Sequence, residues 1–181
     1  MFRKYGFLGI FLILFAELNF ILKIQPFALW YIPIIWWGYI LVVDALVYKI
    51  SHQSLMISQP KRFWFLVLLS IPLWGIFEGY NLYLQNWYYV NYTLATHLIN
   101  FTIIFPAIFE TYYLLKSIHL FDRLKLKKCK ISKSALWTMI ILGLISVILP
   151  FIFPKYAFPL LWIGFFLLLD PLIIYIIIIL V

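Results

Sequence analysis

Six long apolar stretches decide what this 181-residue chain can fold into. Each approaches the 20 or so residues that a helix needs to cross a bilayer. Hydrophobic residues make up 66% of the chain and charged residues 11%, whereas a soluble domain is about half apolar and about a quarter charged. We therefore predict an all-α, polytopic integral membrane helical bundle of about six transmembrane helices, forming a single transmembrane domain over residues 1–181. The expected spans are about 5–23, 28–48, 63–84, 94–116, 135–153 and 157–180.

The positions of the basic residues predict the direction of these spans. If the N-terminus is cytoplasmic, all of the 14 Lys and Arg residues except Lys23 and Lys155 fall at cytoplasmic ends or loops. The positive-inside rule then places both termini in the cytoplasm of a multi-pass protein of the cell membrane. The net charge of +8 is thus a topology signal, and we expect no nucleic-acid partner. The basic loop at about 117–134 should lie on the inner leaflet and attract anionic lipid.

Two of the expected spans share a pattern of uncommon residues. The helices at about 28–48 and 157–180 carry Pro, Trp, Gly, Asp and Leu at one constant spacing, and both run from outside to inside. This predicts a parallel internal repeat, with one copy over about 5–48, a second over about 135–181, and central helices over about 63–116. The matched residues are Pro33, Trp36, Gly38, Asp44 and Leu46 against Pro159, Trp162, Gly164, Asp170 and Leu172.

Acidic residues lie where they oppose membrane insertion. Each acid at the bilayer centre costs about 2.5–3.5 kcal/mol on insertion scales, and no Lys or Arg lies deep in a span to pair with it. We expect neutral acids, or carboxylates hydrogen-bonded to polar side chains. Such groups are candidates for acid-base catalysis, although each could instead hold helices together. The catalytic candidates are Asp44, Glu78, Glu110 and Asp170, and Glu17 is expected to hold helices together.

Aromatic and amide side chains near these acids predict a chamber with aromatic walls. On the span at 63–84, Glu78 and Asn81 share one helical face, and His97 and Asn100 form a similar pair on the next span. No close pair of acids or histidines on one helix resembles a metal-ligand pair, and there is one cysteine, Cys129. We predict no metal and no cofactor. The substrate-binding candidates are Trp37, Trp74, Asn81, His97, Asn100 and Trp162.

Two resemblances extend this interpretation. The stretch from Trp36 to Lys116, with Phe77-Glu78 and Phe105-Pro-Ala-Ile-Phe-Glu-Thr111, resembles a group of uncharacterised prokaryotic six-helix membrane proteins, which implies no activity. The plan of repeated Pro-led, acid-bearing helices is similar to the membrane lycopene cyclases of archaea and fungi. That resemblance implies protonation of a polyene by a carboxylic acid, cyclisation of the cation between aromatic walls, and proton loss to a second carboxylate.

Three hypotheses for the function remain open. The first is an enzyme that performs acid-base chemistry on an apolar isoprenoid, carotenoid or lipid. The second is a structural or accessory membrane subunit whose acids connect helices, and the third is a small proton-coupled carrier. The enzyme requires at least two of the acids to converge beside an apolar chamber, whereas a structural subunit requires them to serve separate helix contacts.

Overall fold

The computed structural model describes residues 1–90, 93–120, 122 and 131–180, with side chains as far as residue 174, and the regular elements in these ranges are all α-helices. Six segments are long and apolar enough to cross a membrane, which confirms the predicted helical membrane architecture. The basic loop lies largely outside the described residues. The helices are α1 (Lys4–Ile21), α2 (Tyr31–Ser51), α3 (Leu55–Ser58), α4 (Pro60–Leu84), α5 (Leu94–Phe101), α6 (Ile104–Ser117), α7 (Lys133–Ile152) and α8 (Pro154–Leu180).

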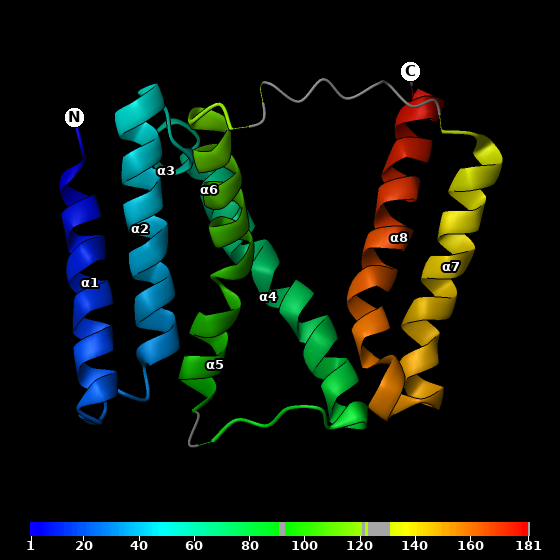
Figure 1. The fold of residues 1–181 in the computed structure, drawn as a ribbon, viewed down its shortest axis with the longest axis horizontal. Coiled ribbons are helices and arrows are strands. Elements are labelled where there is room, and N and C mark those ends of the chain that lie inside the picture. Colours follow the sequence, from blue (N-terminus) through cyan, green and yellow to red (C-terminus); the bar gives the residue numbers. More distant parts are fainter. Residues whose placement is uncertain (91–92, 121, 123–130, 181) are drawn as a thin grey trace. The chain divides into compact units, whose positions relative to one another are not determined.

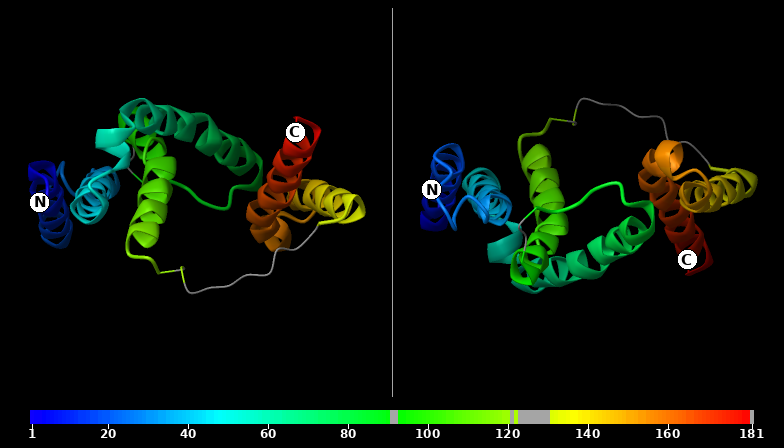
Figure 2. Two further views of the ribbon diagram at one scale, coloured as in Figure 1. Left: turned by 90° about the horizontal axis from the view of Figure 1, so that it is seen from above. Right: turned by 90° about the horizontal axis from the view of Figure 1, so that it is seen from below.

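The helices belong to two compact units, and α4 passes from the first into the second. The first unit comprises residues 1–77 and 89–125, and the second comprises 78–88 and 126–181. In the first unit α1 packs along α2, and α2 also packs against α5 and α6. The views along the helices show α1 and α2 side by side (Figure 2). In the second unit α7 and α8 form a closely packed hairpin.

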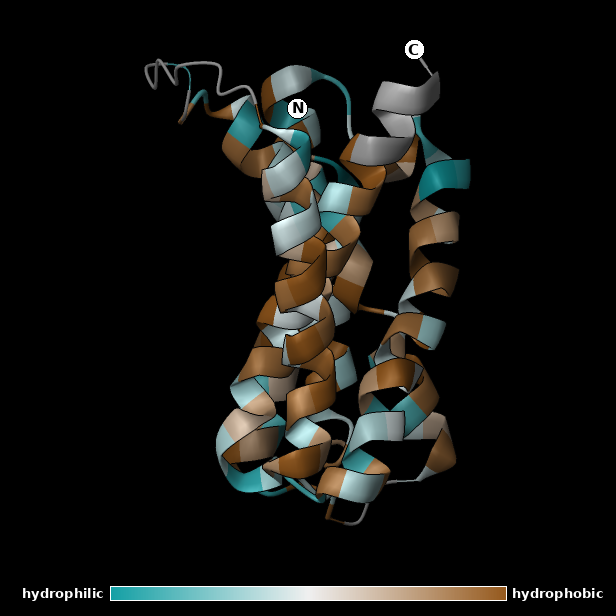
Figure 3. Cartoon of the chain, turned by 90° about the vertical axis from the view of Figure 1, so that its right-hand side faces the viewer, coloured by the Kyte–Doolittle hydropathy of each residue, from teal (hydrophilic) through white to brown (hydrophobic). Residues whose placement is uncertain are grey.

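The outer surfaces of the helices are apolar, as a lipid environment requires. Large hydrophobic side chains are exposed along α1, α4, α7 and α8, including Phe11, Leu68, Ile141 and Phe166. Hydrophobic residues colour most of the middle of the helical cartoon, and hydrophilic residues are more frequent towards its two ends (Figure 3). A soluble protein would bury most such side chains, so this surface fits the hydrocarbon core of a bilayer.

Glycines set how closely the helices of each hairpin approach. A Cβ placed on Gly38 of α2 would lie 2.9 Å from the backbone oxygen of Gly9 on α1. In the second unit a Cβ on Gly143 of α7 would lie 3.1 Å from the backbone oxygen of Gly164 on α8. Small residues let membrane helices approach closely enough for their backbones to touch. Helix contact in both hairpins therefore depends on these glycines.

We expect Gly38→Ala to lower the free energy of unfolding by about 1–3 kcal/mol, the usual range for overpacking. The added methyl group would meet the α1 backbone, which cannot move aside as a side chain can. The matched control is Gly75→Ala on α4, where a Cβ meets no atom within 4 Å and helix propensity favours alanine. Thermal unfolding in detergent measures both variants. Equal unfolding midpoints for Gly38→Ala and Gly75→Ala would show that the contact between Gly38 and α1 does not limit helix packing.

The fourth span differs from the expected continuous helix. It is interrupted at Thr102 and Ile103, between α5 and α6. Pro106 lies in the first turn of α6 and cannot donate a backbone hydrogen bond, so a helix tends to start near such a residue. The backbone N–H of Phe105 finds its acceptor outside the helix, at the Ser70 hydroxyl of α4, 2.9 Å away. Ser70 is fully buried and satisfies a backbone donor that hydrocarbon could not.

The core of the first unit lies between α2, α3, α4 and α6. Its buried apolar residues include Ile40, Leu55, Phe63 and Ala107. The four-residue helix α3, which the sequence did not predict, contributes Leu55, which is 1% exposed. This core fixes α2 against α6 and so determines which side chains of these two helices meet.

Candidate functional site

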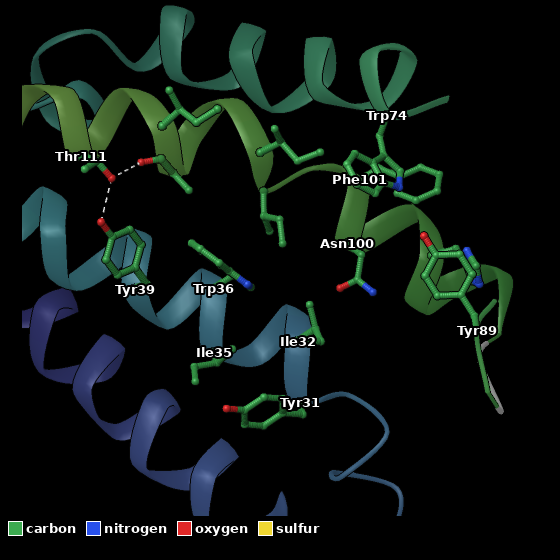
Figure 4. Close-up of a pocket in the computed structure, with 15 residues that line it drawn as sticks. Tyr31, Ile32, Ile35, Trp36, Tyr39, Trp74, Tyr89, Asn100, Phe101 and Thr111 are labelled. Carbon is green, nitrogen blue, oxygen red and sulfur yellow. Dashed lines mark hydrogen bonds between the residues drawn. The ribbon is translucent and has the colours of Figure 1, made fainter. Parts of the chain in front are cut away.

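An apolar pocket of about 940 Å³ lies in the first unit between α2, α5 and α6. Trp36 and Ile35 line it from α2, Phe101 and Ile108 from α5 and α6, and Trp74 from α4. The wall residues Trp36 and Ile108 are also exposed on the outer surface, so the pocket opens on the apolar surface. Figure 4 shows the side chains converging on this space from three sides. Its volume is at the upper end of the range for ligand pockets, about 300–1,000 Å³.

Few polar groups line this pocket, and they lie at its two ends. At one end the Tyr39 hydroxyl and the Thr111 hydroxyl form a hydrogen bond of 2.7 Å across α2 and α6 (Figure 4). At the other end Asn100 extends into the space from α5, near His97, which packs edge-on against Tyr89. The side-chain oxygen of Asn100 is buried and has no hydrogen-bond partner among the described residues. A ligand with a hydrogen-bond donor could satisfy it.

Asp44 occupies a fully buried position on α2, one and a half turns beyond Tyr39. Three donors from three elements surround its carboxylate. The Tyr5 hydroxyl of α1 donates to Oδ2, as does the Ser54 hydroxyl at 2.9 Å. The backbone N–H of Met56 in α3 donates to Oδ1 at 2.8 Å. A carboxylate that only accepts matches three donors, so Asp44 connects α1, α2 and α3.

Glu110 of α6 is also fully buried, but unlike Asp44 it accepts no hydrogen bond from the described residues. Neither carboxyl oxygen has a hydrogen-bond partner among the described residues. The ionisable group within interaction range of Glu110 is the carboxyl of Asp44 on the neighbouring helix. No described Lys or Arg forms an ion pair with either acid. Two adjacent ionised carboxylates in apolar surroundings would repel each other strongly, and Glu110 has no described donor that would stabilise a negative charge.

Neither acid of the carboxyl pair is part of the pocket wall. Thr111, next to Glu110 in the chain, and Tyr39, five residues before Asp44, are the nearest wall residues by sequence. Five residues of α2 correspond to about 7.5 Å along the helix axis. The hydrogen-bonded hydroxyls of Tyr39 and Thr111 are therefore the polar wall groups nearest to the acids along these two helices.

The structure brings together some of the predicted site residues. Asp44 and Glu110 meet in the first unit, and Trp74, His97 and Asn100 line its pocket. Trp37 packs against Phe63 in the core, whereas its neighbour Trp36 lines the pocket.

The other candidates lie in the second unit and have separate local roles. The indole N–H of Trp87 donates to Glu78 at 3.4 Å. Asn81 accepts from the backbone N–H of Asn86 at 3.0 Å and donates to the Trp87 carbonyl at 2.9 Å, which orders the turn after α4. Asp170 on α8 is partly buried and has no hydrogen bond within the described part of the chain. Trp162 is 47% exposed on the same helix.

Glu17 makes the helix contact that the sequence analysis expected of it. The Tyr31 hydroxyl of α2 donates to Glu17 of α1 at 3.0 Å. Within the described ranges, no three His, Cys, Asp or Glu side chains gather as metal ligands would.

Several functional positions were not evident from the sequence. Tyr5 and Ser54 bind Asp44 from positions 39 and 10 residues away, and Tyr39 and Thr111 are 72 residues apart. A serine before Leu55 is a typical helix N-cap, so Ser54 carried a local signal for α3. The tyrosines carried none, because a chain with 13 tyrosines offers many equivalent hydroxyls.

Comparisons of this chain with protein-family models, with curated proteins and with solved structures found no match.

Proposed function

We propose that the first unit binds an elongated apolar molecule, an isoprenoid or a lipid chain, and that Glu110 is the acid in acid-base chemistry on it. One observation supports this most strongly: a lipid-facing pocket with aromatic walls ends beside a buried pair of carboxyls, Asp44 and Glu110. A bilayer concentrates apolar molecules next to the exposed wall residues Trp36 and Ile108. The ligand would enter sideways from the membrane.

The proposed chemistry needs no co-reactant. Glu110 transfers its proton to a carbon-carbon double bond, so that a C–H bond forms and a carbocation results. Aromatic faces such as that of Trp36 stabilise a cation within about 6 Å of the ring centre. Ring closure or migration of the double bond follows, and loss of a proton returns it to the carboxyl pair. Because Glu110 does not line the pocket, the hydrogen-bonded hydroxyls of Tyr39 and Thr111 would relay the proton.

We also propose that the end of this unit that holds α3 faces the cytoplasm of a cell and lies against anionic lipid. The N-terminus, the C-terminal end of α2 and the C-terminal end of α6 all lie at this end (Figure 1). It carries Arg3, Lys49, Arg62 and Lys116, and basic residues are retained on the cytoplasmic side. The pocket would then open in the outer half of the bilayer. The internal repeat stays part of this proposal, supported by the close glycine contacts in both hairpins.

A structural or accessory role is the second candidate. The three hydrogen bonds to Asp44 connect α1, α2 and α3, as expected of a polar side chain that stabilises a bundle. This role accounts for Asp44 fully, but it leaves the unbonded Glu110 and the adjoining pocket without a purpose.

Lipid analysis of a host that produces the protein tests the proposed function. Extracts should contain a converted isoprenoid or lipid with the wild type and lack it with Glu110→Gln, because an amide cannot donate the proton. Ile35→Trp should have the same effect by filling the pocket. The matched control is Ile141→Trp on α7, an exposed position away from the pocket, and it should keep the wild-type profile. Identical profiles for the wild type and Glu110→Gln would favour the structural role.

A further inference from the structure

A second, polar pocket of about 310 Å³ lies at the α3 end of the first unit. It is formed by the end of α2, by the turns on either side of α3, and by the end of α6 with the turn that follows it. Gln53, Gln59 and Lys116 line it and are exposed, so water from the adjoining aqueous phase can enter. Its lining is more polar than that of the apolar pocket.

Ser54 connects this polar pocket to the buried acids. It forms part of the pocket lining, yet it is 4% exposed. Its hydroxyl donates to Oδ2 of Asp44 at 2.9 Å, and Asp44 in turn interacts with Glu110. Hydrogen-bonded polar groups thus lead from the aqueous end of the unit to Asp44, which lies on the helix that packs against the helix of Glu110.

We propose that the polar pocket is the proton entrance of the Asp44–Glu110 pair and that the Ser54 hydroxyl is the relay. A hydroxyl both donates and accepts, so a hydronium ion in the pocket can protonate Ser54 Oγ while Ser54 passes its own proton to Asp44. Asp44 then protonates Glu110 whenever Glu110 has lost its proton, and no other reactant is consumed. This inference goes beyond the proposed function, because proton exchange at Glu110 does not depend on what occupies the apolar pocket.

Other ionisable groups surround this route. Tyr113, Lys116 and His119 face the polar pocket, and the His119 ring is hydrogen-bonded to Asp122. On the α1 side Tyr5 donates to the same Asp44 oxygen as Ser54. Tyr5 is therefore the alternative relay, and a test has to separate the two hydroxyls.

Infrared spectroscopy of the purified protein transferred into D₂O follows exchange at Glu110 directly. The C=O band of a protonated carboxylic acid shifts when the acid hydrogen is replaced by deuterium. A band that the wild type shows and Glu110→Gln lacks is assigned to Glu110. Ser54→Thr keeps the hydroxyl and should exchange at the wild-type rate. Ser54→Asn keeps an α3 cap, since asparagine caps helices well, but an amide cannot relay a proton, so exchange should slow about tenfold or more. Tyr5→Phe removes the other hydroxyl at the same oxygen and should slow exchange less than Ser54→Asn does.

These variants also separate a relay from a purely structural role of Ser54. If Ser54 only caps α3, the Asn and Thr variants exchange equally fast, and the proposal is overturned. If a substitution loosens the unit, exchange becomes faster, which is the opposite of the expected sign. Slower exchange in Tyr5→Phe with no change in Ser54→Asn would place the entrance on the α1 side. Absence of a protonated band that depends on Glu110 would likewise overturn the proposal.

Discussion

Replacing Asp44 with alanine is expected to lower the free energy of unfolding by about 3–5 kcal/mol, because three buried donors lose their acceptor. The substitution leaves three donors without an acceptor: the Tyr5 hydroxyl, the Ser54 hydroxyl and the backbone N–H of Met56. Each unsatisfied buried donor costs about 1–3 kcal/mol. Unfolding in detergent, by heat or by a denaturing surfactant, measures the change.

Asp170 provides the matched control for this prediction. It occupies the corresponding place in the sequence pattern of α8, but it has no hydrogen bond within the described residues and is only partly buried. Asp170→Ala should change stability by less than about 0.5 kcal/mol, as substitutions away from buried networks do. If the two alanine variants lose equal stability, the hydrogen bonds around Asp44 are not what stabilises the first unit.

Replacing Glu110 with leucine should have the opposite effect on stability and abolish the proposed chemistry. Glu110 is fully buried with both carboxyl oxygens unbonded, and its neighbour Asp44 is another acid. A buried polar group without a hydrogen-bond partner carries a desolvation penalty of about 1–3 kcal/mol, which an apolar residue of similar volume does not carry. We expect Glu110→Leu to unfold at a higher temperature than the wild type. Glu110→Gln, which keeps a polar group in the same place, should change the midpoint little.

The Glu110→Leu variant distinguishes a catalytic role of Glu110 from a structural one. An enzyme retains a destabilising acid because its chemistry needs it, so Glu110→Leu should combine higher stability with loss of the converted lipid. If the Leu variant is strongly destabilised, Glu110 contributes a helix contact and the structural role gains support. The unfolding midpoint and the lipid profile of the same variant decide between these results.

Much of the architecture could be predicted from the sequence because the bilayer imposes a length on each span. The first span, expected at about 5–23, was found at Lys4–Ile21, and the fifth, expected at about 135–153, was found at Lys133–Ile152. The break between α5 and α6 was not predicted. Pro106 was visible in the sequence, but the acceptor that satisfies Phe105, the Ser70 hydroxyl, lies 35 residues away.

The sequence also shows that the acids within the spans are costly to bury. It does not show which of these acids lie next to one another in the fold. Asp44, Glu110 and Asp170 look alike in the sequence, since each is a lone carboxyl among apolar neighbours. Asp44 acquires three donors because α1 and α3 fold back against α2, and Glu110 meets it because α2 packs against α6. Asp170 and Glu78 belong to the other unit and have different surroundings.

The sequence by itself determined that this chain forms about six apolar helices, because hydrocarbon accepts only segments that satisfy their own backbone hydrogen bonds. Only the tertiary structure decided where polar side chains gather and where a pocket remains. Helix length and composition are properties of single segments, whereas the meeting of Asp44 with Glu110 depends on the rotation of α2 and α6 about their axes. That rotation is fixed by side-chain packing in the core around Ile40, Phe63 and Ala107.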